Sequence, residues 1–263
     1  MSKFAKILIA KLVVLLAWIG IFQGRSPSEV LTIIADRLDS RPARTILIFG
    51  NSRTSSNHMP DMLRHIADAA HDPRKYELTV VAPNGASFES LSQDAGLRQD
   101  MGQSWDDVIA QGESRGQSTP ELITSFMTNG QALLKAARPK AGKPRLIVNW
   151  AYDQSLYEKN DPGGRAEHYQ SMQAIQLNLA RQADAHIVNV GRVWEDLHEK
   201  MPDVALTTDG NHPTQVASYF VALCLYVDLS GQDVRDVNWA PFGITTEIAT
   251  RVREIVSQDR SEL

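Results

Sequence analysis

Five short apolar segments alternate with longer segments that have helical spacing along most of this chain. The first apolar segment, residues 45–49, is rich in β-branched and aromatic side chains and ends at Gly50. Runs of this kind, apolar at consecutive positions, are typical of strands buried on both faces of a parallel sheet. The five predicted strands are residues 45–49, 76–82, 105–110, 145–149 and 186–190.

The segments between these runs show the periodicity of helices. Pro60 and Pro120 stand where a first helical turn tolerates proline, and Thr119 is a suitable cap for the second of these helices. Further helices are predicted to begin near Ser87 and after Gly164, and to cover residues 193–200, 213–227 and 244–257. Regular alternation of strand and helix favours βαβ units, a parallel sheet and a three-layer sandwich.

The amino terminus has the pattern of a membrane-targeting segment. Lys3 and Lys6 precede residues 7–22, which are apolar apart from Lys11. No A-x-A-like cleavage site follows, so the pattern favours an uncleaved anchor over a cleaved signal, and an amphipathic surface helix remains an alternative. Because these lysines outweigh Arg25, we expect the domain to lie outside the cytoplasm, in the cell envelope. Cleavage would make it secreted or periplasmic.

Composition narrows the function classes. Hydrophobic residues make up 43% of the 263 residues and charged residues 22%, as in globular proteins, and the net charge of −4 with no basic stripe argues against a nucleic-acid partner. The single cysteine, Cys224, lies in an apolar helix and is expected to be a buried thiol. The sequence contains neither a zinc-type His-Glu-x-x-His motif nor a glycine-rich nucleotide fingerprint, so no metal or cofactor is predicted.

Candidate chemistry lies where the predicted strands end. Ser52 follows the first strand, and Asp209 and His212 lie three residues apart before a late helix. The carboxyl ends of parallel strands share one edge of the sheet, where ligands bind in open α/β folds. A carboxylate that orients a histidine, which in turn activates a serine hydroxyl, forms a catalytic triad. A polar turn at Ser52 and an ordinary capping loop at Asp209 remain the simpler alternatives.

Four motifs together resemble those of the SGNH (GDSL-type) serine hydrolases. They occur in the family's order over residues 45–228: Phe49-Gly-Asn-Ser-Arg-Thr, Asn84-Gly-Ala-Ser, Gln111-Gly-Glu-Ser and Asp209-Gly-Asn-His-Pro. The third motif is similar to that of the carbohydrate and sialate acetylesterase branch. The resemblance implies a flavodoxin-like three-layer α/β/α sandwich with a five-stranded parallel sheet.

The resemblance also implies residue roles. Ser52 matches the nucleophile, and Asp209 and His212 match the rest of the triad. The backbone N–H groups of Ser52 and Gly85 and the side-chain amide of Gln111 match an oxyanion hole. Gln111 stands where many members have asparagine.

The first motif departs from the family's Gly-Asp-Ser-Leu signature. Asn51 and Arg53 replace its aspartate and leucine. This departure leaves the assignment of Ser52 in place.

Trp150 and Tyr152, after the fourth strand, are candidates for lining an acyl or sugar pocket. Aromatic rings that cover the core are the alternative.

The resulting expectation is a serine esterase that hydrolyses O-acyl esters, plausibly acetyl esters on an envelope glycan. An acyltransferase on the same triad, and a non-catalytic glycan- or partner-binding envelope protein, are the alternatives. The expected organisation is an anchor or signal (1–24), a linker (25–44), a hydrolase domain (45–230) and a helical extension (231–263).

Overall fold

The computed structural model describes residues 39–114, 119–137, 139–156 and 164–263. The predicted anchor at residues 1–24 and most of the predicted linker lie outside these residues. Within the described ranges, no helix combines the length and the apolar character needed to cross a membrane. Residues 43–263 form one compact unit, which carries all the elements described below.

The five predicted strands form one parallel sheet in the order β2-β1-β3-β4-β5. The flavodoxin-like sandwich and its five-stranded parallel sheet are therefore confirmed. The observed strands are β1 (Ala43–Phe49), β2 (Lys75–Val81), β3 (Asp107–Gln111), β4 (Arg145–Ile147) and β5 (His186–Val188).

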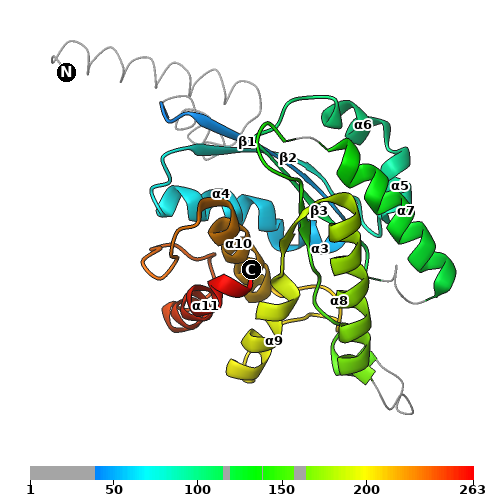
Figure 1. Cartoon of the computed structure of the whole chain (residues 1–263). Helices are drawn as coiled ribbons and strands as arrows, with labels where there is room; N and C mark the ends of the chain where they lie inside the picture. The colour runs from blue at the N-terminus through cyan, green and yellow to red at the C-terminus, as the bar shows by residue number, and fades with distance from the viewer. Residues whose placement is uncertain (1–38, 115–118, 138, 157–163) are drawn as a thin grey trace, which may run out of the picture. The chain divides into compact units, whose positions relative to one another are not determined.

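Helices and single helical turns connect the strands (Figure 1). The first half of the unit contains α3 (Ser52–Ser55), the 3-10 turn η1 (Ser56–His58), α4 (Met59–Ala69), α5 (Phe88–Gln93), α6 (Ala95–Met101) and α7 (Pro120–Ala136). The second half contains η2 (Gln154–Leu156), α8 (Gly164–Ala183), α9 (Val190–Lys200), α10 (Gln215–Ser230), α11 (Thr246–Gln258) and η3 (Arg260–Glu262). The predicted polar helix from Ser87 is divided into α5 and α6 because Asp94 has an extended backbone and caps α6.

The two faces of the sheet bury separate cores because successive strand side chains point in opposite directions. Ile46 and Ile48 of β1 pack with residues of α4, α9, α10 and α11. Leu47 and Phe49 pack with residues of α5, α6, α7 and α8. Figure 1 shows these two groups of helices on opposite sides of the sheet.

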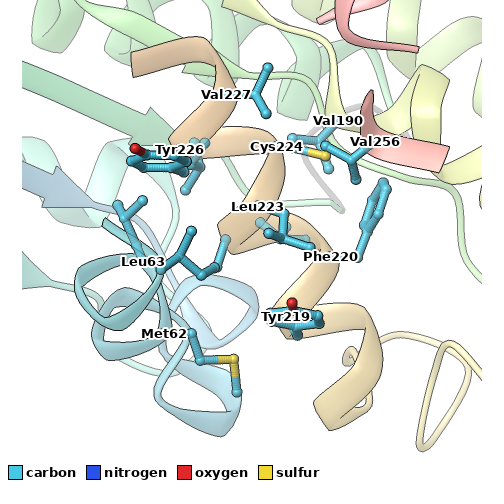
Figure 2. Close-up of a cluster of buried hydrophobic side chains, with 14 of the residues drawn as sticks. Met62, Leu63, Val190, Tyr219, Phe220, Leu223, Cys224, Tyr226, Val227 and Val256 are labelled. Atoms are coloured by element: carbon cyan, nitrogen blue, oxygen red, sulfur yellow. The ribbon is translucent and has the colours of Figure 1, made fainter. Parts of the chain in front are cut away.

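Helix α10 is the centre of the first core. All of residues 217–227 are buried, so the helix is apolar around its whole circumference. Figure 2 shows Leu223 and Tyr226 near Leu63 of α4, and Phe220 near Val256 of α11. Helix α11 therefore belongs to the core, with Val252 and Val256 fully buried. Cys224 is buried here as predicted, and burial raises the pKa of its thiol.

A chain of buried ion pairs lies at the amino ends of the strands. Asp107 accepts hydrogen bonds from Arg44 Nε at 2.5 Å and from Arg145 Nη1 at 2.6 Å. Arg145 Nε also donates to Asp228 at 2.6 Å. The side chains of Arg44 and Asp107 are each only 6% exposed, so each charge depends on its partners for stabilisation.

We expect Asp107→Ala to lower the free energy of unfolding by about 3–5 kcal/mol, because it leaves a buried arginine charge without its carboxylate. Urea unfolding measures this loss. Asp203→Ala, which removes the partner of Arg251 at the surface, is the control and should change stability little. A loss at Asp107 no larger than at Asp203 would contradict this view of the ion pairs.

Candidate active site

The nucleophile candidate lies on a tight turn after β1. Gly50 has no room for a side chain, since a Cβ atom there would stand 2.2 Å from Thr54 Oγ1. The Asn51 side chain caps α3 by accepting a hydrogen bond from Arg53 N at 3.0 Å. Ser52 is consequently the first residue of α3, where strand β1 gives way to a helix.

Asp209 and His212 lie on a loop that closes before α10. Thr208 N donates to His212 O, and Thr214 N donates to Leu206 O, both at 2.9 Å. Gly210 lies in this loop with a φ of +83°, a left-handed conformation that favours glycine. Outside the loop, Asp153 N donates to Gly210 O at 2.7 Å. These bonds hold the loop at the carboxyl edge of the sheet.

The structure brings Ser52, His212 and Asp209 into one hydrogen-bonded series. Ser52 Oγ lies 2.9 Å from His212 Nε2, and His212 Nδ1 lies 2.7 Å from Asp209 Oδ2. When Nδ1–H donates to the carboxylate, Nε2 is left to accept from the serine hydroxyl. This is the geometry of a nucleophile, a base and a group that orients the base.

Asp209 is held in its ionised form by donors from its own loop. The backbone N–H of His212 donates to Oδ1 at 2.7 Å, the His212 ring lies 2.7 Å from Oδ2, and the N–H of Asn211 donates to Oδ1 at 3.0 Å. Together they lower the pKa of the Asp209 carboxyl to about 2. The Asp209 carboxylate is therefore charged at neutral pH.

Ser52 and His212 open into a cleft of about 670 Å³. Its wall includes Gly85, in the turn after β2, and Glu113, in the loop after β3. Among the described residues, no group accepts a hydrogen bond from the backbone N–H of Ser52 or of Gly85. Both donors are therefore available to a ligand at this edge of the sheet.

The Gln111 side chain does not lie in the cleft beside these two N–H donors. It is 1% exposed and does not line the cleft. Its Oε1 accepts from the Thr54 hydroxyl, and its Nε2 donates to Asn149 Oδ1 at 2.7 Å. The predicted role of this amide in an oxyanion hole has no support from the geometry, because its position as the last residue of β3 turns it to its neighbours in the interior.

The two aromatic pocket candidates lie elsewhere. Trp150 is fully buried and stacks on Trp194, with ring centroids 4.4 Å apart. It is a core residue, so the prediction that it lines the pocket is wrong. Tyr152 is half-buried and also lies outside the lining of the cleft, but its hydroxyl is 2.7 Å from the hydroxyl of Ser114, which does line it.

Two residues of this region had no role in the sequence prediction. Arg53 is 2% exposed, and its Nε donates to Asn211 Oδ1 at 2.8 Å. The only available signal was the departure of Arg53 from the family's leucine. Asn211 lies inside the Asp-Gly-Asn-His motif, and the spacing of Asp209 and His212 in that motif gives no indication of a role for the residues between them.

Residues suited to hold a metal do not gather here. Over the described ranges, no group of three or more His, Cys, Asp or Glu side chains is placed to bind one ion.

No protein-family model and no curated protein matches this chain. Solved structures do. A DUF4886 family protein from Bacteroides uniformis matches with a TM-score of 0.65 at 14% identity, over 82% of this chain and 94% of that one. A protein from Slackia heliotrinireducens, provisionally described as an SGNH hydrolase, matches with a TM-score of 0.55 at 24% identity, over 72% and 100%. Axe2, an acetylxylan esterase from Geobacillus stearothermophilus, matches with a TM-score of 0.53 at 13% identity, over 76% and 97%. The resemblance to SGNH hydrolases is thereby confirmed at the level of the fold.

We expect Gly210→Ala to cost about 1–3 kcal/mol of stability, because alanine is strained at a positive φ and its Cβ would stand 2.6 Å from Leu156 Cγ. Gly231→Ala is a matched control, with a φ of +70° and no atom within 4 Å of the new Cβ. Urea unfolding should show the larger loss at Gly210. Adding Leu156→Ala should recover part of that loss, and equal losses at the two glycines would contradict the proposed clash.

The pKa of Asp209 predicts a pH dependence. A carboxyl whose pKa falls on folding, here from 3.8 to about 2, stabilises the folded state above pH 3.8 and loses this effect as pH falls toward 2. The difference in urea midpoint between the wild type and Asp209→Asn should therefore shrink from pH 5 to pH 2. A difference that does not change over this range would show that ionisation of Asp209 does not stabilise the folded state.

Proposed function

We propose that this protein is a serine esterase that cleaves carboxylic esters through Ser52, His212 and Asp209. One observation carries the proposal: Ser52 Oγ lies 2.9 Å from His212 Nε2 while His212 Nδ1 lies 2.7 Å from Asp209. The esterases among the structural neighbours, such as Axe2, favour the same reaction class.

The first chemical step is acyl transfer to Ser52. His212 accepts the hydroxyl proton as Ser52 Oγ attacks the ester carbonyl, and Asp209 stabilises the imidazolium that forms. The N–H groups of Ser52 and Gly85 receive the developing oxyanion, which both can do because neither donates to another described residue. His212 then gives the proton to the departing alcohol.

The second step restores the enzyme. Water loses a proton to His212 and attacks the acyl carbon, the bond to Ser52 Oγ breaks, and Ser52 regains its proton from His212. The products are the free acid and the alcohol.

For the substrate, we propose O-acetyl esters, because Axe2, one of the structural neighbours, is described as an acetylxylan esterase. An envelope glycan as the alcohol side, and export or anchoring of the domain, are further proposals that depend on the sequence of residues 1–24.

The proposed nucleophile is tested by labelling the full-length chain with a fluorophosphonate and mapping the adduct by mass spectrometry. We expect the label on Ser52 and its loss in His212→Ala, because an unassisted hydroxyl is a poor nucleophile. Hydrolysis of a small acetyl ester should fall at least about 10⁴-fold in Ser52→Ala.

Ser55→Ala is the control, since Ser55 lies on the same short helix but is exposed and outside the lining of the cleft. It should keep both the label and the activity. A folded Ser52→Ala protein with wild-type esterase activity would refute the triad.

A further inference from the structure

Arg53, the residue after the nucleophile, is buried against the loop that carries the base. Its side chain contacts Asn211 and Trp150, and its guanidinium carbon also lies 5.2 Å from the centroid of the Tyr152 ring. Nε donates to Asn211 Oδ1 at 2.8 Å, Nη1 donates to Trp150 O at 2.9 Å, and the guanidinium carbon lies 4.6 Å from the centroid of the Trp150 ring.

Asn211 is held by the same pair of residues. Trp150 Nε1 donates to the backbone oxygen of Asn211 at 3.4 Å, in addition to the bond from Arg53. Arg53, Trp150 and Asn211 thus contact one another in all three pairings. We name these three residues the clamp.

The clamp connects the segments that carry the triad. Arg53 adjoins Ser52 in α3, and Asn211 adjoins His212 in the loop. Trp150 follows β4 and is fixed by its stack on Trp194. A guanidinium can reach two acceptors at once in a fixed plane, which a lysine ammonium cannot do in the same way.

We propose that Arg53 is a positioning residue, which sets the distance between Ser52 Oγ and His212 Nε2 by fixing the Asp209–His212 loop through Asn211 against Trp150. This inference rests on the proposed esterase function for its catalytic consequence, but the fixing of the loop does not depend on that function. It also gives a reason for the arginine in place of the family's leucine, which has no hydrogen-bonding group to offer the loop.

The test uses two variants. Arg53→Met preserves side-chain bulk but removes the donor, and Asn211→Ala removes the amide oxygen that accepts from Arg53 Nε. Two quantities are measured on the full-length chain. One is the maximal rate constant of fluorophosphonate labelling at Ser52, measured at saturating reagent so that it does not depend on how tightly the reagent binds. The other is hydrogen exchange in the peptide spanning residues 206–214, whose Asn211 and His212 amides donate to Asp209.

We expect the labelling rate constant to fall by about 10-fold to 100-fold in each variant, because small displacements of a catalytic group carry such costs. The reagent's affinity should change much less, and exchange in the loop should become faster. Arg53→Met combined with Asn211→Ala should be no slower than the slower single variant, since both remove the same bond. Arg53→Lys should behave like Arg53→Met although it keeps the charge.

Arg44→Met is the matched control. Arg44 is also a buried arginine, 5% exposed, but it stands at the opposite end of β1 and pairs with Asp107. Its variant should lose stability while the folded protein keeps the wild-type labelling rate and loop exchange.

The outcomes separate the two proposals. Wild-type labelling rates in folded Arg53→Met and Asn211→Ala, in a protein whose wild type is labelled, would overturn the positioning role. If the wild type takes no label, the proposed function fails, and loop exchange decides on the clamp: faster exchange only in these variants supports it, and unchanged exchange overturns it. If Arg53→Met does not fold, Asn211→Ala carries the same test.

Discussion

A buried network of amides beneath the cleft is the constraint on which the site depends. Gly112 O accepts from Asn51 Nδ2 at 3.1 Å and from Asn149 Nδ2 at 3.0 Å, while Gln111 bridges Asn149 and Thr54. These residues come from the ends of β1, β3 and β4, so one set of hydrogen bonds fixes three neighbouring strand ends. Because polar groups buried without partners are costly, the network has few alternative arrangements, and the cleft has a rigid floor.

The fold was easier to predict from the sequence than the details of the site. Strands such as residues 45–49 are recognisable because burial on both faces demands apolar side chains at every position. Ser52, Asp209 and His212 were predicted because a triad has a known chemistry and because their motifs resemble those of the SGNH hydrolases and occur in the same order. The structure places these three within hydrogen-bonding distance, whereas their catalytic roles stay a proposal.

Gln111 and Trp150 show where sequence reasoning reached its limit. Both stand at strand ends next to the cleft, and one residue of difference decides whether a side chain faces the ligand or the interior. Gln111 turned out to satisfy Asn149 and Thr54, and Trp150 to lie between Arg53 and Trp194. Such choices depend on partners from distant segments, which no local pattern contains. Arg53 was missed for the same reason, since its acceptor lies 158 residues away along the chain.

The placement of Asp209 and His212 at the rim has a consequence for the fate of a bound acyl group. Their side chains are 54% and 34% exposed, whereas Ser52 begins a helix anchored in the interior. Bulk solvent therefore reaches the His212 side chain directly. Water and any acceptor alcohol would then compete for an acyl group on Ser52. If Ser52 carries an acyl group as proposed, an acceptor alcohol would compete best with water by covering this rim while it binds.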